Sequence, residues 1–462
     1  MRIEEEFNKT GYFWLPGKEE KKIPGTLSIY DGGKIELEIV GHFGEEADSF
    51  NDDNEPIRII GHIEKDGLVT LDGCIYIQKN HSFGGISKSE IRVHKVLSGA
   101  AWDKEEALTF NTFAFSVDCL DEWIGISGIN IEHDWESRST TISYSPPENI
   151  SFRLANGMRF EICFAYTFPG SHKITEAKIT QRAYFKLESE HPPNLNNFIS
   201  IAFKITNLMC FAMDEVVSIQ KVTATSTEIQ YDAGDENYYP VPISIYYHSN
   251  PFPEKKPKKN RHEMLFNFRT IREDFQKVLD NWLNAYEYLY PAIGLYFSTK
   301  TGAQKYLEGK FLALAQGLET YHRRTSTETL MHTSSYEALI IKIMESCPKE
   351  HSEWLNGRLA HGNEINLGKR LKSIIDPFKA HLGTSKKRGK ILRNIVDTRN
   401  YLTHYSEELK QKSAKGRDLW ILCLSMEIIF NLHFLKVIGF TDNEIKEVIK
   451  SCHPLKSKLE EI

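Results

Sequence analysis

The chain has 462 residues, of which 40% are hydrophobic, 26% charged and 11% aromatic, and its formal net charge is −6. This balance is ordinary for a globular protein, so it excludes a largely disordered chain and a chain that binds nucleic acid through overall positive charge. At about 100 to 200 residues per domain, the length predicts two or three domains.

The seven cysteines are spread along the chain without a C-x-x-C pair, which is typical of reduced core thiols in a cytoplasmic protein. The N-terminal segment is acidic and lacks a continuous apolar stretch, so we expect no signal peptide. We also expect no membrane partner, because no stretch comes near the ~18 uncharged apolar residues of a membrane span. The predicted location is the cytoplasm.

Residues 1–250 are predicted to form a β-rich N-terminal domain with a sensor or regulatory role. Short apolar runs recur between turn signals such as Asp31-Gly32-Gly33. In the stretch KIELEIV, the residues Ile35, Leu37 and Ile39 alternate with polar ones, as in a strand with one buried face. Many short antiparallel strands at this spacing suggest a sandwich or barrel. We favour a sandwich-like domain, with one helix over residues 195–209.

Residues 251–300 are predicted to be a linker followed by a connecting helix. The segment SNPFPEKKPKKNRHE (residues 249–263) combines prolines with lysines and has no apolar period. A solvated linker is the favoured interpretation, and a basic patch for RNA is the alternative. The hydrophobic period then becomes 3.6, with Phe275, Val278 and Trp282 on one stripe.

Residues 301–462 are predicted to form a helical bundle, because further segments with this period follow. Gly439 lies where a C-terminal helix cap would, and the spacing of Thr441 and Glu444 is that of a capping box. The fold class is therefore multidomain α+β, with an antiparallel β-sandwich-like domain followed by an all-α bundle.

The sequence contains no GxGxxG, P-loop, HExxH or G-x-S-x-G motif, and its 17 histidines form no metal-type pairs. We therefore expect neither a metal nor a cofactor. What remains is RNYLTH, residues 399–404. On a helix, Asn400 and His404 are i, i+4 neighbours, and Arg399 and Thr403 form a second such pair. Arg399 and His404 are about 140° apart around an ideal helix.

The surroundings of this string are basic. Residues 381–417 contain ten Lys and Arg against three Asp and Glu, which suits a polyanion. Two solvated loops flanking a helix are the alternative interpretation. The candidate substrate-binding residues are Thr403, Lys386, Lys387, Arg388, Lys390 and Arg393.

An Arg and a His together fit one reaction without a metal. In RNA the 2′-OH can attack the adjacent phosphorus, and a neutral imidazole can take the hydroxyl proton. A guanidinium can hold the non-bridging phosphate oxygens as charge develops. The candidate catalytic residues are thus Arg399, His404 and Asn400, which can orient the imidazole or bind phosphate. The products would be a 2′,3′-cyclic phosphate and a 5′-OH.

The string R-x4-H with a polar residue after the Arg, on a late helix of a bundle, resembles the signature of HEPN ribonucleases. FLALAQGLETYHRR (311–324) resembles the first bundle helix of the ApeA-like HEPN subgroup, and GRLAHGNEINLGKRLKSII (357–375) resembles its middle section. GYFWLPG (11–17) and IPGTLSIYDGGKIELEIVG (23–41) resemble the ApeA N-terminal β domain. The chain is thus similar to ApeA-type anti-phage proteins in both halves.

This resemblance implies a metal-independent endoribonuclease of bacterial abortive infection, with tRNA as one candidate substrate and a phage-derived trigger sensed by the N-terminal domain. It also implies a HEPN homodimer in which two R-x4-H helices face each other, with a higher oligomer left open. The apolar stretch of residues 419–435 exceeds what one small bundle layer needs, which we take as further support for a dimer.

Two other function classes stay open. The first is a non-catalytic HEPN protein that binds nucleic acid or a partner and uses its β domain for recognition. The second is a carbohydrate-binding β half, for which Trp123 and Trp135 are candidates, although a packed core is favoured for them.

The β half is expected to control the nuclease rather than to bind RNA. Its sequence contains no basic cluster comparable to residues 381–417. The polar segment of residues 43–56 is acidic and could cover the basic cleft by charge complementarity.

Overall fold

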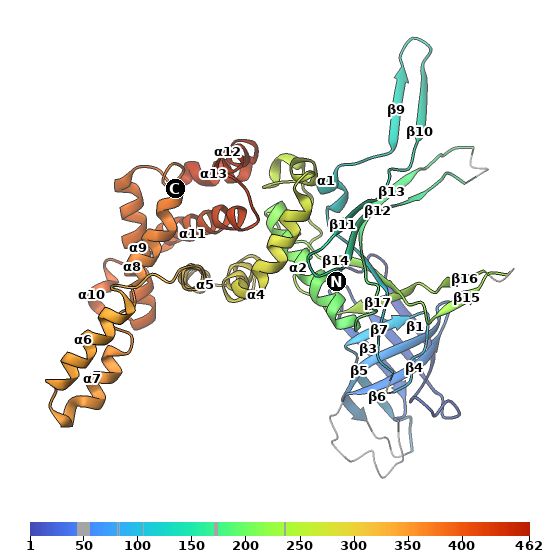
Figure 1. The fold of residues 1–462 in the computed structure, drawn as a ribbon. Helices are drawn as coiled ribbons and strands as arrows, with labels where there is room; N and C mark the ends of the chain where they lie inside the picture. Colours follow the sequence, from blue (N-terminus) through green and yellow to red (C-terminus); the bar gives the residue numbers. More distant parts are fainter. Residues whose placement is uncertain (44–55, 81, 83, 105, 171–173, 235–236) are drawn as a thin grey trace. The chain divides into compact units, whose positions relative to one another are not determined.

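The computed structural model describes residues 1–462 except 44–55, 81, 83, 105, 171–173 and 235–236. The chain divides into two compact units, Met1–Leu283 and Asn284–Ile462. The first unit is antiparallel β and the second is mostly helical (Figure 1), which confirms the predicted α+β class. Residues 43–56, the acidic segment expected to cover the basic cleft, lie almost wholly outside the described residues.

Six strands of the first unit close into a barrel. In ring order they are β1 (Phe7–Trp14), β2 (Ile23–Ile29), β3 (Ile35–Val40), β6 (Lys88–Arg92), β5 (Gly67–Asn80) and β4 (Ile57–Ile63). The pairing of β5 with β6 closes the ring. Ile35, Leu37 and Ile39 are fully buried inside it, as the alternation of KIELEIV predicts.

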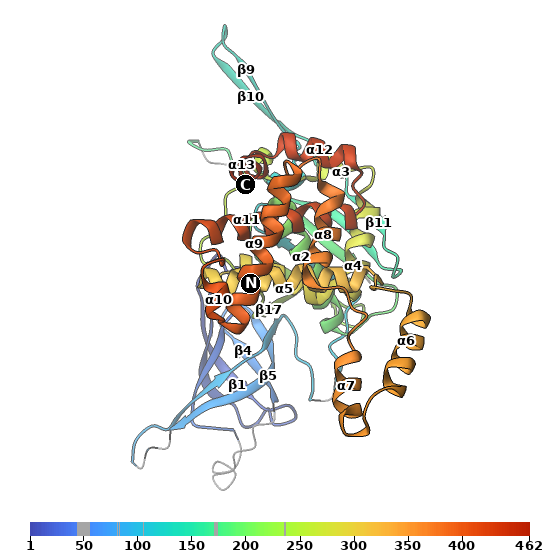
Figure 2. The same ribbon diagram turned by 90° about the vertical axis from the view of Figure 1, so that its left-hand side faces the viewer.

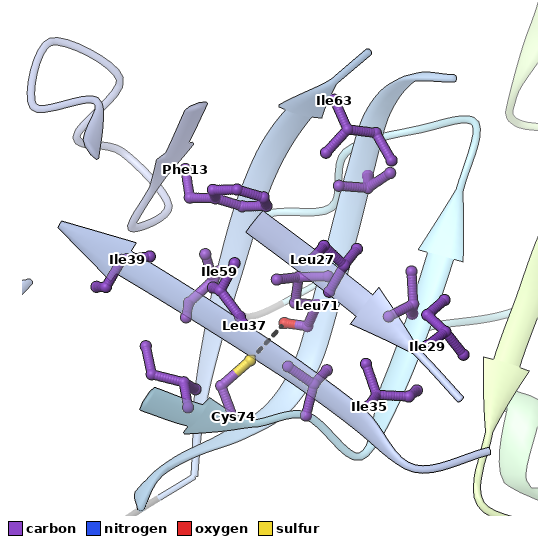
Figure 3. Close-up of a cluster of buried hydrophobic side chains, with 14 of the residues drawn as sticks. Phe13, Leu27, Ile29, Ile35, Leu37, Ile39, Ile59, Ile63, Leu71 and Cys74 are labelled. Atoms are coloured by element: carbon purple, nitrogen blue, oxygen red, sulfur yellow. Dashed lines mark hydrogen bonds between the residues drawn. The ribbon is translucent and has the colours of Figure 1, made fainter. Parts of the chain in front are cut away.

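The barrel interior is filled by aliphatic side chains around Phe13 (Figure 3). The thiol of Cys74 donates a hydrogen bond to the Leu71 carbonyl oxygen at 3.5 Å. Burial holds the pKa of Cys74 well above its ordinary value, so this thiol stays protonated and unreactive.

The barrel continues into an open sheet, because the long strand β5 also pairs with a seventh strand through residues 69–72. The order from there is β7 (Lys95–Ser98), β17 (Ile243–Tyr247), β14 (Ile219–Thr225), β8 (Thr112–Val117), β13 (Thr180–Glu188), β12 (Arg159–Thr167) and β11 (Ile150–Arg153). Helix α2 (Leu195–Met213) packs on one face of this sheet, where Phe198 stacks on Phe113. The antiparallel β domain, for which we favoured a sandwich-like form, is thus a barrel that continues into a sheet covered by a helix.

Two hairpins project from the first unit (Figure 1). They are β9 (Ile129–Asp134) with β10 (Ser139–Tyr144), and β15 (Gln230–Asp232) with β16 (Tyr238–Pro240). Trp135 at the turn of the first hairpin is 85% exposed, whereas Trp123 in helix α1 (Leu120–Ile124) is fully buried. The two candidate carbohydrate-binding tryptophans are therefore not brought together.

Residues 249–263, here called the strap, pack against the first unit instead of forming a solvated linker. The Pro253 carbonyl accepts a hydrogen bond from Arg2, and the Pro257 carbonyl accepts one from Cys119. Arg261, in the 3-10 turn Arg261–Glu263, donates to the Gly125 carbonyl at 3.0 Å. Prolines without a hydrophobic period signal irregular backbone, and irregular backbone can be packed as well as solvated.

The first unit ends with α3 (Phe268–Ile271) and the first part of α4 (Phe275–Lys300). Phe275 contacts the rings of Phe152 and Phe160, and Trp282 stacks on Phe211. The predicted stripe of helix α4 is therefore part of the core of this unit.

The second unit is a bundle around α11 (Gly416–Val437), which contacts α5 (Leu307–Thr325), α9 (Ser385–His404) and α13 (His453–Glu461). The other helices are α6 (Thr333–Glu345), α7 (Ser352–Leu359), α8 (Leu367–Ile375), α10 (Glu407–Lys410) and α12 (Asp442–Ser451). Helices α6 and α7 extend from the bundle as an arm (Figure 2). Gly439 has φ 110°, and Thr441 and Glu444 form the predicted capping box.

The apolar face of α11 is buried inside its own unit. All but two of residues 419–435 are buried, so this face is not the spare dimer surface that the sequence suggested. Polar contacts stabilise the same helix: Glu427 pairs with Lys300 at 3.0 Å and with Lys310 at 2.6 Å.

Among the described residues, helices α2 and α11 are long and apolar enough to cross a membrane, by length and composition alone. The apolar windows of these helices are 61% and 83% buried within the structure. Such burial is usual for core helices of globular proteins, which pass the same test.

Candidate functional site

Helix α9, labelled in Figure 2, carries the R-x4-H string in its last two turns according to its bounds, Ser385–His404. It begins after Thr384, whose hydroxyl accepts a hydrogen bond from the Lys387 N–H at 3.3 Å. It ends at His404, because Tyr405 takes the left-handed conformation with φ 51°. Only Ile395 and Thr398 of this helix are fully buried. The helix therefore keeps its polar end out of the core.

The four polar residues of the string lie at different depths. Arg399 and Asn400 are half-buried, whereas Thr403 and His404 are exposed. The Arg399 guanidinium donates to the Asn400 side-chain oxygen at 3.4 Å. The Thr403 hydroxyl donates to the Arg399 carbonyl oxygen at 2.7 Å. Thr403 thus satisfies the backbone of its own helix, and Asn400 contacts the guanidinium directly.

Arg399 and Thr403 share a solvent-open hollow of about 500 Å³ with helix α5. Its other lining residues are Leu312, Gln316, Glu319, Thr320 and Arg323. The Glu319 carboxylate lies 3.8 Å from the Arg399 guanidinium and 3.2 Å from that of Arg323. The distance between Arg399 and Glu319 is long, and the Arg399 side chain is about a third exposed. The ion pair is therefore weak, and an anionic ligand can replace Glu319 as the partner of Arg399.

His404 does not line this hollow. It is exposed at the end of the helix, where the rings of Tyr401 and Tyr405 are 5.5 Å apart. Within one copy of the chain, the Arg399 side chain therefore lines the hollow and that of His404 does not. This agrees with the 140° between them on an ideal helix.

The basic residues proposed to bind substrate lie in the first half of α9. Lys386, Lys390 and Arg393 are exposed. Arg388 instead donates to the carbonyl oxygens of Lys379 and Gly383, so it stabilises the preceding loop. At 1.5 Å per helical residue, Lys386 is about 20 Å from Arg399 along the axis. These cations thus extend away from the string and do not surround it.

Glu319 is the site residue that sequence analysis missed. Its spacing to Arg323, i to i+4 on a helix, signals a local ion pair. The same spacing gives no indication of the third partner, because Arg399 is 80 positions away and reaches Glu319 only through the packing of α5 against α9. Among the described residues, no three His, Cys, Asp or Glu side chains gather in a group that could hold a metal ion.

The chain thus combines a β unit that contains a barrel with a helical bundle that exposes the R-x4-H end of α9. Residues 8–282, more than half of the chain, match the family model for ApeA N-terminal domain 1, and residues 312–444 match that for Apea-like HEPN. The chain therefore belongs to the ApeA family, with the domain pair of a HEPN nuclease-like defence protein. Comparison with curated proteins and with solved structures gave no match.

Proposed function

We propose that the protein is a metal-independent endoribonuclease whose active site is built from Arg399, Asn400 and His404. The observation that carries this proposal is the exposed end of α9, where an imidazole and a guanidinium are accessible to a phosphodiester. Membership of the ApeA-like HEPN family, whose domains are generally ribonucleases, supports it.

Each group has one task in the proposed reaction. The imidazole of His404 takes the proton of the RNA 2′-OH, and the oxygen attacks the adjacent phosphorus. The guanidinium of Arg399 leaves its loose contact with Glu319 and holds the non-bridging oxygens as negative charge develops. Asn400 orients the guanidinium through its 3.4 Å contact. The bond between phosphorus and the 5′ oxygen breaks, and this oxygen takes up a proton from water, which leaves a 2′,3′-cyclic phosphate and a 5′-OH; the imidazole later returns its proton to solvent.

A complete site requires two copies of the chain. Arg399 faces the α5 hollow and His404 does not, so one copy does not present both groups to one phosphate. In a two-fold homodimer with facing α9 helices, the Arg of one copy meets the His of the other. The ring of Tyr405, directly after the string and 67% exposed, offers apolar area for such a contact.

The direct test is cleavage of RNA in excess EDTA by the full chain. We expect cleavage that His404→Ala abolishes and that His351→Ala, an exposed histidine of the same unit, leaves unchanged. A substrate with a 2′-deoxy sugar at the cleavage position should stay intact, since its attacking hydroxyl is missing. Equal cleavage by a folded His404→Ala protein would sink the mechanism and leave a non-catalytic binding protein.

The wider setting of this activity follows from the family. We propose that the protein acts in the cytoplasm, that tRNA is among its substrates, and that the N-terminal unit responds to a phage-derived trigger. Comparing RNA from infected cells with the wild-type protein and with His404→Ala tests the substrate: tRNA fragments ending in 2′,3′-cyclic phosphate should appear only with the wild type.

A further inference from the structure

The hairpin of β9 and β10 projects from the first unit with one apolar face uncovered (Figure 1). The register pairs Ile131 with Ile142, and because side chains alternate along a strand, both lie on the same face. Ile131 is 53% exposed and Ile142 is 49% exposed. Every residue of β9 after Ile129 and every residue of β10 before Tyr144 is exposed. The rest of the described chain therefore leaves this face open.

The apolar face continues beyond the two isoleucines in both directions. Near the turn, the ring of Trp135 lies 5.5 Å from that of His133. At the base of the hairpin, the ring of Tyr144 lies 5.5 Å from that of Tyr166 and 6.0 Å from that of Phe168. Contiguous apolar surface of this kind marks binding sites for other proteins. The exposed apolar side chains of this surface, here called the strip, are Ile131, Trp135, Ile142, Tyr166 and Phe168.

The outer edge of β9 is open as well. Among the described residues, β9 pairs with β10 and with no other strand. An open edge presents backbone N–H and C=O groups that a further strand can bind, and natural proteins usually protect such edges with lysine or proline. The six residues of β9, INIEHD, include neither. A two-stranded hairpin is only marginally stable in water, so a third strand would also stabilise this one.

The charge of the hairpin indicates which kind of ligand fits it. Residues 129–144 contain three acidic residues against one arginine, a net charge of −2 with histidine neutral, and Glu132 lies on the face opposite to the strip. This charge repels RNA, anionic membrane surfaces and the same hairpin of a second copy. Beside the two isoleucines, the His133 ring and the Thr140 hydroxyl lie 3.1 Å apart and bond each other, so this face offers little to a sugar. A protein segment with an apolar side and a basic side fits best.

We propose that the outer edge of β9 binds an extended segment of a partner protein as a third strand, in which apolar side chains alternate with Lys or Arg. The apolar side chains of this segment extend the strip beside Ile131, and its cations lie beside Glu132 on the opposite face. One register satisfies both faces, because neighbouring strands place their side chains on the same two faces with the same period of two. An acidic segment matches the strip and leaves Glu132 beside a like charge. Main-chain hydrogen bonds supply affinity in this mode of recognition, and the alternating side chains supply specificity.

Synthetic peptides test this strand addition with the full chain. The probe is a short labelled peptide in which valine alternates with lysine, and its counterpart has glutamate in place of every lysine. We expect fluorescence anisotropy to show binding of the lysine peptide about tenfold tighter than that of the glutamate peptide. N-methyl groups on two neighbouring central residues remove backbone donors from both edges of the lysine peptide, so this third peptide should not bind.

Variants of the hairpin assign the contact to β9. Ile131→Thr/Ile142→Thr keeps β-branched side chains but removes the apolar pair, and should weaken binding of the lysine peptide about fivefold. Glu132→Lys should weaken binding of the lysine peptide and tighten that of the glutamate peptide. Glu136→Lys makes the same charge change at an exposed position of the turn, and should change either affinity by less than about twofold. Hydrogen exchange of the β9 amides should slow when the lysine peptide is bound.

Several outcomes would overturn the proposal. Equal affinity for the lysine and glutamate peptides, or no binding of the lysine peptide, removes the charge match. Binding that survives N-methylation removes the backbone ladder. A lower molecular mass of Ile131→Thr/Ile142→Thr than of wild type, measured by light scattering, assigns the strip to a second copy of the chain. None of these measurements depends on RNA cleavage, so this proposal and the proposed nuclease activity fail independently.

Discussion

The two basic surfaces of this protein differ in how the sequence encodes them. Around α9 the cations are neighbours in sequence, yet the helix distributes them over about 20 Å. Arg388 donates to a carbonyl oxygen of the preceding loop instead of facing solvent with the others. On the open sheet of the first unit, a hollow lined by β8, β13, β14 and the strap gathers cations from three separate stretches of sequence between residues 178 and 259. The clustering of cations in the sequence therefore suggested a more compact basic surface around α9 than the structure has. The scattered positions of the other cations gave no sign that they gather on the sheet.

The same difference bears on the N-terminal unit. Its sequence contains no basic cluster comparable to residues 381–417, and control of the nuclease without contact to RNA stays a prediction. Of the seven cations that the fold gathers around the hollow, five are paired with acids of the same unit.

The largest effects should come from the string on α9. Arg399→Ala and His404→Ala should each lower RNA cleavage by about 10²–10⁴-fold, since each removes a group required in the transition state. Arg417→Ala, an exposed cation of the same basic stretch, should be nearly neutral for the rate at saturating RNA. An equal loss in Arg417→Ala would mean that charge alone, not the string, drives cleavage, and would break the distinction between the site and its basic surroundings.

Acid should destabilise the helical unit through His433, which is buried between Tyr321 and Phe378. Burial lowers its pKa to about 4, although the hydrogen bond to the Ile374 carbonyl opposes this. Because the unfolded chain takes up a proton near pH 6.5 and the folded one near pH 4, stability falls as the pH is lowered through this range. The slope should reach about 1.4 kcal/mol per pH unit.

Thermal unfolding at several pH values, for wild type and His433→Phe, checks this expectation. The variant keeps a ring between its two neighbours and cannot titrate, so its stability should depend less on pH over pH 4 to 6.5. Parallel pH curves would contradict it. The same control separates acid unfolding from other effects of pH on cleavage.

Asn400→Ala should lower cleavage less than either catalytic variant, because Asn400 contacts the guanidinium and is not itself the base. A reduction of about tenfold in the rate at saturating RNA, with little change in RNA affinity, is the expected outcome. A loss of cleavage as large as that of His404→Ala would instead indicate that Asn400 contacts the phosphate directly.

The smallest effect concerns Glu319, whose carboxylate competes with phosphate for Arg399. Glu319→Gln should tighten RNA binding about two- to fivefold, the scale of a partly exposed ion pair. Glu308→Gln in the first turn of the same helix is the matched control. Weaker cleavage with unchanged affinity would instead make Glu319 a positioning residue for the guanidinium.

Local patterns could be predicted from the sequence because they depend on neighbours. The alternation around Leu37, the cap at Gly439 and the capping box at Thr441 all appear in the structure. The expected helix from residue 195 extends to Met213, and the R-x4-H string lies on a helix as expected.

Features that depend on distant pairing could not be predicted. The second role of β5, which joins barrel and sheet, needs the register of β7. The contact of Glu319 with Arg399 needs the packing of two helices. The apolar face of α11 looked excessive because the sequence does not show how many helices surround it.

Mixing two inactive variants tests the central claim most directly. If the Arg of one copy acts with the His of the other, a dimer of Arg399→Ala with His404→Ala contains one intact site and one doubly damaged site. Refolded or co-expressed mixtures of the two proteins should therefore recover RNA cleavage, up to about half the wild-type rate per mixed dimer, while each variant alone stays inactive. Mixed dimers that form and cleave no RNA would contradict a site shared between two copies.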